Sequence, residues 1–179
     1  MVSEQKTVLV LGPAGAGKAT AIGCILFKFG GIDMLTLERF QKEGIRLCGQ
    51  AARNLKSPGV QPSFDTPNFH VVVSDGSSKV DCVLLVIPAD SAQSHLEKEL
   101  DIVADAAKQI IVLINKMDDM NWSEVAFQST VHSLGRVMQG VPVIPFSALR
   151  GDNAVELSSE TAWYEGPTLL MALETSFRT

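Results

Sequence analysis

The sequence predicts an α/β fold in which helices cover both faces of a mainly parallel sheet. Short apolar runs alternate with longer amphipathic stretches along the whole chain, as expected for parallel strands joined by crossover helices. The length of 179 residues and the hydrophobic content of 46% suit one domain with a single sizeable core. No repeat or low-complexity segment interrupts the alternation. We therefore expect one three-layer domain over residues 1–179.

The first third of the chain is expected to contain a strand, two helical stretches and a loop. Residues 6–12 are rich in Val and Leu and predict the first strand. Residues 17–30 predict a helix with one apolar side, ended by a Gly-Gly pair. Residues 32–56 continue as a more polar helical stretch. Residues 56–68 contain three prolines and are expected to be loop.

The remaining elements continue the alternation. Residues 69–75 and 79–89 are Val-rich and predict two strands joined by a short connection. Helical stretches and strands then follow in turn. The expected helices are 94–108, 123–139 and 166–177, and the expected strands are 109–114 and 141–148. The strands that precede candidate motifs are expected to end at the same edge of the sheet.

Composition excludes several classes of function. The formal net charge is −5 and no run of Lys or Arg occurs, so direct nucleic-acid binding is not expected. Residues 1–12 do not resemble a secretory signal, and no apolar stretch approaches the length of a membrane span. Cys24, Cys48 and Cys82 form no metal-ligand pattern, and we interpret them as reduced, mostly buried residues. We expect a cytoplasmic protein without membrane contact.

The first candidate site is the glycine-rich stretch after the first expected strand. The pattern G-x-x-x-x-G-K-[ST] brings backbone N–H groups and a helix N-terminus to phosphate oxygens, and its lysine reaches the β and γ phosphates. The stretch matches at every fixed position except the last, where Ala19 replaces a hydroxyl. A glycine-rich turn without a ligand is the alternative interpretation. The residues concerned are Gly12, Pro13, Ala14, Gly15, Ala16, Gly17, Lys18, Ala19 and Thr20.

The second candidate site is the tetrapeptide NKMD, which directly follows the apolar strand at 109–114. The carboxylate of Asp118 can accept from N1–H and from the exocyclic amine of guanine, a pair that adenine does not offer. The stem of Lys116 would cover the base plane, and Asn115 would tie this loop to the phosphate loop. The alternative is a polar turn that caps a helix.

The third candidate is Ser147, Ala148 and Leu149, after the last expected strand. The backbone N–H of Ala148 would donate to the guanine carbonyl oxygen. The tripeptide has little specificity alone. The order is informative, because phosphate loop, NKMD and SAL each follow a strand in the order that a guanine-nucleotide domain requires. Together they predict a P-loop NTPase of the G-domain type.

These motifs give the chain a resemblance to the GTP-binding domain of the elongation factor 1-alpha family. Residues 17–44 resemble that family's first helix and its extension, and residues 109–120 resemble its guanine strand. Residues 141–174 resemble its last strand, Gly-Asp-Asn loop, Trp-aromatic-x-Gly segment and final helix. The resemblance implies a G domain that binds GTP or GDP. The family's tRNA-binding β-barrel domains are not expected within this length.

The magnesium position departs from the family pattern. The resemblance implies that a hydroxyl after the loop lysine binds Mg²⁺, and the methyl group of Ala19 cannot do so. Thr20 is one residue further along, which on a helix points about 100° away. Asp75 takes the place of the aspartate of the family's D-x-x-G motif. Thr20 and Asp75 are the remaining metal candidates, and magnesium is expected to contribute little.

The switch regions of the family are compressed here into residues 56–81. No D-x-x-G motif follows Asp75, and Thr66, in the sequence FDTPN, is interpreted as a turn residue and not as the switch threonine. No histidine matches the family's catalytic position, and we assign no catalytic residue. The histidines are His70, His95 and His132.

We interpret the chain as a guanine-nucleotide-binding module that is impaired in hydrolysis and switching, with its protein partner left open. One alternative is a slow GTPase in which Thr20 or a partner supplies the missing groups. Another is a pseudo-GTPase scaffold without nucleotide. A small-nucleotide kinase is disfavoured by NKMD and SAL, and a divergent copy without selected activity also stays open.

Overall fold

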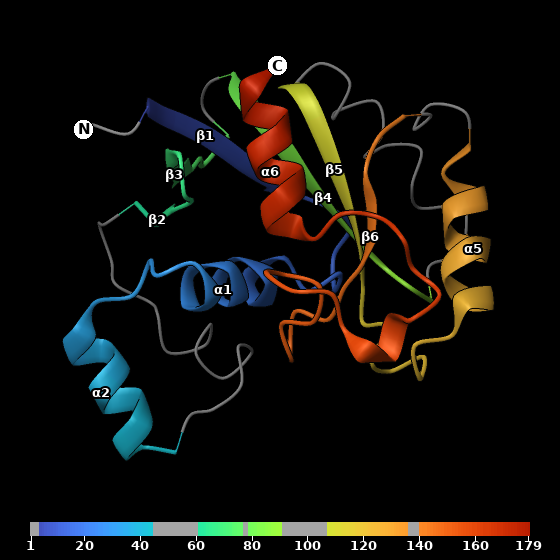
Figure 1. Ribbon diagram of the computed structural model, residues 1–179, viewed down its shortest axis with the longest axis horizontal. Coiled ribbons are helices and arrows are strands. Elements are labelled where there is room, and N and C mark those ends of the chain that lie inside the picture. The colour runs from blue at the N-terminus through green and yellow to red at the C-terminus, as the bar shows by residue number, and fades with distance from the viewer. Residues whose placement is uncertain (1–3, 45–60, 77–78, 91–106, 136–139) are drawn as a thin grey trace.

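The computed structural model describes residues 4–44, 61–76, 79–90, 107–135 and 140–179 (Figure 1). Within these residues, six strands form one sheet in the order β2-β3-β1-β4-β5-β6. Only β2 and β3 pair antiparallel, and the other neighbours are parallel. The strands are β1 Glu4–Leu11, β2 Ser63–Asp65, β3 Phe69–Val73, β4 Val80–Pro88, β5 Ala107–Asn115 and β6 Val143–Pro145. The predicted mainly parallel α/β fold is confirmed.

Helices cover both faces of this sheet. In Figure 1, α6 lies over β4 and β5, whereas α5 lies at the side of the sheet near β6. One buried cluster joins the strands to α1 and α6, and a second joins them to α5. The predicted three layers are therefore present. The helices are α1 Lys18–Lys28, α2 Met34–Lys42, α5 Glu124–Ser133 and α6 Leu169–Arg178, with a 3₁₀ turn, η3, at Ser159–Thr161.

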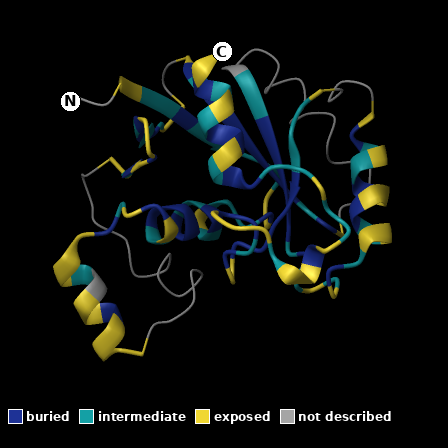
Figure 2. Ribbon diagram, in the orientation of Figure 1, coloured by how far each residue is buried: buried dark blue, intermediate teal, exposed yellow. Residues whose placement is uncertain are grey.

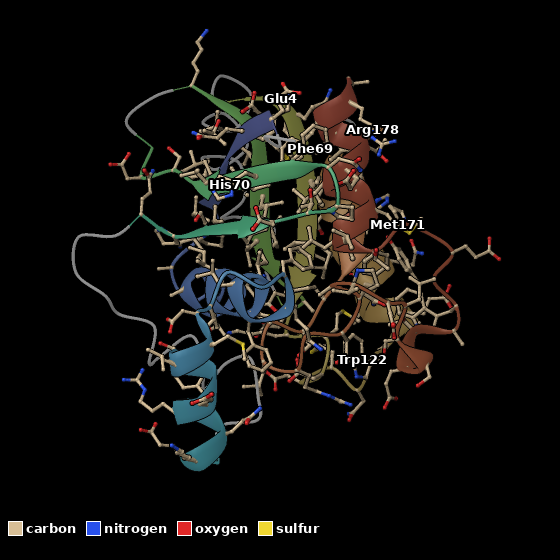
Figure 3. The ribbon with its side chains drawn as sticks, turned by 60° about the vertical axis from the view of Figure 1, so that its left-hand side comes forward. Glu4, Phe69, His70, Trp122, Met171 and Arg178 are labelled. Carbon is tan, nitrogen blue, oxygen red and sulfur yellow. The ribbon has the colours of Figure 1, made fainter. Side chains whose placement is uncertain are left out.

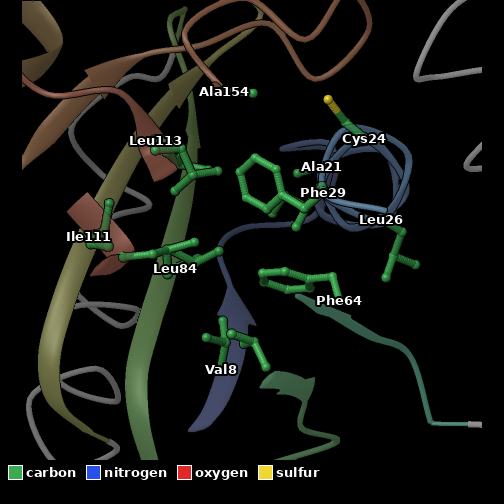
Figure 4. Packing of buried hydrophobic residues seen from close by; sticks show 14 of the residues in the cluster. Val8, Ala21, Cys24, Leu26, Phe29, Phe64, Leu84, Ile111, Leu113 and Ala154 are labelled. Atoms are coloured by element: carbon green, nitrogen blue, oxygen red, sulfur yellow. The ribbon is translucent and has the colours of Figure 1, made fainter. Parts of the chain in front are cut away.

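Alternation along the central strands divides the core between the two faces. In β4, Leu84 and Val86 pack with the α1 and α6 cluster, whereas Leu85 and Ile87 pack with the α5 cluster. All four are completely buried, as Figure 2 shows for the central strands, which explains the continuous apolar run in the sequence. Figure 4 shows Leu84 in the first of these clusters.

The parallel register places the carboxyl ends of the strands at one edge of the sheet. Leu11 of β1 pairs with Leu85 of β4, and Pro88 pairs with Asn115 at the end of β5. The three candidate motifs follow β1, β5 and β6, so their loops share that edge, as the sequence led us to expect. Ligands of open parallel sheets bind at this edge.

Three expected elements differ from the structure. The predicted loop at 56–68 contains β2, because Phe64 is buried against Phe29, with ring centroids 5.4 Å apart. The helical stretch predicted at 32–56 ends at Lys42, before Gly44 at φ 69°, and residues 45–60 lie outside the described part. The helix predicted at 94–108 lies largely outside it too. Its last two residues belong to β5, whose pairing with β4 extends back to Ala107.

The turn between β2 and β3 is fastened to α6 by Glu174. This carboxylate accepts hydrogen bonds from the backbone N–H of Asn68 at 3.2 Å and from its side-chain amide at 2.5 Å. Burial raises the pKa of Glu174, but hydrogen bonds from Thr66, Asn68 and Arg178 outweigh it and lower the pKa below 4.5. The ionised carboxylate therefore stabilises the folded state.

Replacing Glu174 with alanine is expected to lower the free energy of unfolding by about 1–2 kcal/mol at pH 7, because hydrogen bonds to a charged acceptor are lost. The pKa is depressed on folding, so this contribution is present above pH 4.5 and disappears as the pH falls through the folded-state value. Urea unfolding of wild type and Glu174→Ala between pH 7 and pH 3 measures it. Glu165→Ala, at an exposed glutamate, is the control. A pH-independent difference would contradict the account.

Candidate nucleotide site

The loop from Gly12 to Lys18 connects β1 to α1 and requires glycine at fixed positions. Gly12 has φ 144°, and a Cβ there would lie 2.0 Å from the carbonyl oxygen of Val86 in β4. Gly17 has φ 92°, and a Cβ there would lie 2.5 Å from Nδ2 of Asn115. The loop therefore lies close against β4 and the end of β5. Its geometry is built from backbone, which matches a phosphate-binding loop.

Lys18 closes the loop on itself. Its ammonium nitrogen donates to the carbonyl oxygens of Gly12 at 2.7 Å and Pro13 at 2.8 Å. An ammonium group has three N–H donors, so one donor is left for a further acceptor. Gly17 caps α1 without a side-chain hydrogen bond, and the first turn has no acidic residue. The N-terminal amides and partial positive charge of α1 thus suit an anion.

Asn115 joins three loops at the carboxyl edge. Asn115 is 3% exposed, its Nδ2 donates to the carbonyl oxygen of Ala16 at 2.8 Å, and its Oδ1 accepts from the backbone N–H of Ala148 at 2.9 Å. The expected tie to the phosphate loop is therefore present. A side-chain amide nitrogen carries two N–H donors, so the second can serve another acceptor.

The turn at residues 116–122, called here the Asp118 turn, folds tightly after β5. Lys116 has φ 65°, and Met117 is completely buried with its N–H donating to the carbonyl oxygen of Phe146 at 3.2 Å. The N–H of Trp122 returns to the carbonyl oxygen of Met117 at 2.9 Å. Burial of Met117 leaves Lys116 and Asp118 on either side of it half-buried, at positions accessible to solvent.

The turn at residues 147–151, called here the Ala148 turn, follows β6. Ser147 is buried, and its carbonyl oxygen and Oγ accept from the N–H groups of Gly151 at 2.7 Å and Arg150 at 3.1 Å. Leu149 is 40% exposed. The N–H of Ala148 was expected to face a guanine oxygen, but here it donates to Asn115. A base acceptor would therefore have to share that donor with Oδ1 of Asn115 or displace it.

The metal candidates do not form a ligand set. Ala19 is exposed on the first turn of α1, and its methyl group cannot coordinate a cation; Thr20 beside it is half-buried. Asp75 follows β3 near the same edge, because the N–H of Ser74 donates to the carbonyl oxygen of Val8 at 2.7 Å. Among the described residues, no group of three or more His, Cys, Asp and Glu is placed to hold a metal ion. At Ala19, the chain therefore does not fit the magnesium site that its family resemblance implies.

Thr66 and His70 lie away from the carboxyl edge. The Oγ of Thr66 accepts from the N–H of Phe69 at 3.2 Å, and Phe69 pairs with Glu4 at the opposite end of β1 from the phosphate loop. Thr66 is therefore a turn residue, as expected. His70, labelled in Figure 3, lies 2.8 Å from a carboxylate oxygen of Asp65 on the surface. His132 is exposed on α5, and His95 lies outside the described residues.

The described cysteines lie in the hydrophobic core. Cys24 and Cys82 are buried, and burial raises the pKa of the Cys82 thiol to about 12. Cys48 lies outside the described residues. Within the described part of the chain, no helix combines the length and apolar character needed to cross a membrane.

Asn153 and Tyr164 form hydrogen bonds to the backbone of β6. Sequence analysis gave them no role in the site. Asn153 is completely buried with φ 59°, and its amide donates to the carbonyl oxygen of Pro145 at 2.7 Å. The hydroxyl of Tyr164 donates to the carbonyl oxygen of Val143 or Pro167, at 3.1 and 3.0 Å, and burial raises its pKa to about 12. The Gly-Asp-Asn and Trp-aromatic-x-Gly segments were the signal that could have identified these supports.

Comparison with known proteins identifies the family. Residues 63–177 match the model of the elongation factor Tu GTP binding domain. The match contains the Asp118 turn and the Ala148 turn, and it begins after the phosphate loop. The fold and the loops at its carboxyl edge thus define a translation-factor GTP-binding domain. The chain belongs to the elongation factor Tu GTP binding domain family.

The relatives are elongation factors and related proteins. The chain is 30% identical to elongation factor 1-alpha of Coccidioides immitis (strain RS) over 93% of its length, and 31% identical to that of Plasmodium falciparum (isolate K1 / Thailand) over 97%. It spans 46% and 50% of these proteins, about half of each.

Two solved structures share the fold. The structure of sup35 complexed with GMPPNP has a TM-score of 0.72 and 26% identity, covering 96% of this chain and 44% of that one. The Ski7 GTPase-like domain of S. cerevisiae, bound to GTP, has a TM-score of 0.70 and 21% identity, covering 99% of this chain and 51% of that one.

Asn115→Ala is expected to lower the free energy of unfolding by about 2–3 kcal/mol, because a buried acceptor at Ala16 and a buried donor at Ala148 lose their partner. Urea denaturation measures the change. Gln128→Ala on the exposed side of α5 removes an amide of similar kind and should change stability little. Equal stabilities of the two variants would show that Asn115 does not join the loops.

Proposed function

We propose that the chain binds GDP and GTP selectively, with little contribution from Mg²⁺, and hydrolyses GTP slowly or not at all. The observation that carries the proposal is the pair of Asn115 hydrogen bonds, which hold the phosphate loop and both turns together. The methyl group at Ala19 is the reason to expect little contribution from Mg²⁺. Family membership supports the guanine nucleotide as ligand. The chain then acts as a guanine-nucleotide-binding interaction module that is impaired in switching, and a cytoplasmic location remains part of the proposal.

The phosphate half of the proposed site relies on backbone and one lysine. The amides at the start of α1 and the third N–H of Lys18 would contact phosphate oxygens. The two carbonyls that hold Lys18 keep its ammonium group at the loop before a ligand arrives. This arrangement supplies positive charge without a metal ion, which supports binding of diphosphate in the absence of magnesium.

The base half of the proposed site relies on the two turns. Asp118 would accept from N1–H and the 2-amine of guanine, and the second N–H of Asn115 Nδ2 would donate to N7. Lys116 is half-buried and Leu149 is exposed, and their side chains would cover the two faces of the guanine ring. The Ala148 N–H would donate to the guanine carbonyl oxygen and to Oδ1 of Asn115 at the same time. Ser147 holds this turn closed from within.

Weak hydrolysis follows from missing groups. Phosphoryl transfer needs a metal ion, charge neutralisation and a positioned water. Of these, the described residues supply a cation at Lys18, whereas Ala19 provides no metal ligand. His70 pairs with Gln5 near the start of β1, at the opposite end of that strand from the phosphate loop. We therefore assign the site a binding role and derive no hydrolytic step from it.

A titration with fluorescent GDP, GTP and ATP, each with magnesium and with EDTA, tests the proposal. We expect guanine selectivity, affinities that differ less than threefold between magnesium and EDTA, and no turnover of GTP. Strong magnesium dependence with turnover would favour the slow GTPase, in which Thr20 and Asp75 contact the metal. Absence of binding would favour the scaffold without nucleotide.

Restoring the hydroxyl separates these outcomes further. Ala19→Ser is expected to strengthen GTP binding about tenfold in magnesium and to leave it unchanged in EDTA, because one inner-sphere ligand is regained. The exposed position of Ala19 should accept serine without loss of stability. Ala14→Ser, an exposed alanine in the same loop, is the control. Equal effects of the two substitutions would contradict the assignment of position 19 to the metal.

Asp118→Asn tests the base. The substitution replaces one carboxylate oxygen with a donor, so the GDP affinity is expected to fall at least tenfold while xanthosine diphosphate, which has an oxygen in place of the 2-amine, gains affinity. Competition with fluorescent GDP measures both affinities. Asp119→Asn, at the exposed neighbouring carboxylate, is the matched control. Unchanged selectivity in Asp118→Asn would remove Asp118 from the site.

A further inference from the structure

Selection of guanine requires the Asp118 turn and the Ala148 turn to keep a fixed spacing. The groups that distinguish guanine from adenine lie along one edge of one ring, and the proposed contacts come from two turns that follow different strands. Hydrogen bonds weaken steeply when the donor and acceptor are misaligned. A slip of about 1 Å between the turns would therefore cost much of the selectivity.

Trp122 and Arg150 connect the two turns on the outer side of the site. Trp122 ends the Asp118 turn, is 6% exposed and is labelled in Figure 3. The guanidinium carbon of Arg150, which lies in the Ala148 turn, is 5.9 Å from the centre of the Trp122 ring. This distance is within the range of a cation–π contact. The contact joins side chains of the two turns. It adds to the backbone hydrogen bond from the N–H of Met117 to the carbonyl oxygen of Phe146, which precedes the Ala148 turn.

Two carboxylates hold Arg150 in this place. Its Nε lies 3.4 Å from Oδ2 of Asp152, and its Nη2 lies 3.7 Å from Oε1 of Glu160. Asp152 is itself fixed, because the hydroxyl of Ser158 donates to its Oδ1 at 2.9 Å. A planar guanidinium can contact two carboxylates and still stack on a ring, which an ammonium group cannot do in the same way.

The segment behind the turns holds Trp122 from the other side. The indole N–H of Trp163 donates to the carbonyl oxygen of Trp122 at 3.1 Å. Trp122 is thus held by Arg150 at its ring and by Trp163 at its backbone. Both partners come from the chain that follows β6, so the end of the Asp118 turn is fastened to that segment at two points.

We propose that Arg150 is a positioning residue for guanine selection, which fixes the Asp118 turn against the Ala148 turn by covering Trp122. The inference rests on the proposed function. Arg150 does not touch the nucleotide in this account and acts through the spacing of the two turns. Its loss should therefore weaken binding of guanine and spare binding that depends on phosphate alone.

The experiment compares dissociation constants for GDP and ADP in wild type, Arg150→Leu and Arg150→Lys. Arg150→Leu is expected to weaken GDP binding about tenfold and to leave ADP binding unchanged, so the ratio of the two constants falls about tenfold. Arg150→Lys should give an intermediate ratio of the GDP and ADP constants, because lysine keeps the positive charge but lacks the planar guanidinium group. Arg39→Leu is the matched control, since Arg39 lies 5.5 Å from the Phe40 ring in α2, away from the turns.

Amide hydrogen exchange without nucleotide gives a second measurement. Arg150→Leu should speed exchange at Met117 and Trp122, whose N–H groups are hydrogen-bonded within and beyond the turn, and Arg39→Leu should not. Arg150 has 45% of its side chain exposed, so the melting temperature should change little. Equal selectivity in wild type and Arg150→Leu would overturn this inference alone, as would an equal loss in Arg39→Leu. A wild-type chain that does not distinguish GDP from ADP would overturn the proposed function and this inference with it.

Discussion

The buried side chain of Asn115 is the interaction on which the carboxyl edge of the sheet depends. One amide group donates to Ala16 in the phosphate loop and accepts from Ala148 after β6, while the Asn115 backbone ends β5. Gly17 must lack a Cβ for this approach to occur. The loops that would bind phosphate and base are thereby made into one unit. A buried polar group with both ends satisfied favours a single arrangement over alternatives.

The candidate site is built mainly from backbone groups. Among the described residues, Lys18 supplies a positive charge at the phosphate loop. Family membership implies a guanine nucleotide, and the methyl group at Ala19 offers no metal ligand. In the proposed function, recognition and hydrolysis therefore separate along this edge. Recognition depends on loop geometry, which the parallel sheet and Asn115 retain. Hydrolysis depends on groups aimed at the γ-phosphate, and Ala19 supplies none.

Sequence analysis predicted the fold and the common edge of the three motif loops, because Val-rich runs mark buried parallel strands and each motif follows a strand. It missed β2, since three residues among prolines give no periodicity and pairing with β3 decides their structure. It anticipated the Asn115 contact with the phosphate loop but not the use of the Ala148 N–H by Asn115. The contact of Arg150 with Trp122 depends on tertiary packing across two turns, which local spacing does not encode.

The most direct test of this account is an amide NMR titration of the ¹⁵N-labelled chain with GDP and with ADP in EDTA. The account predicts that GDP shifts the resonances of Gly12, of residues 14–19, of Ala148 and of the Asn115 side-chain amide together, at one common affinity. ADP at equal concentration should shift Ala148 much less. Shifts of the phosphate loop without Ala148 and Asn115, or the same pattern with both nucleotides, would contradict the claim that Asn115 unites a guanine site.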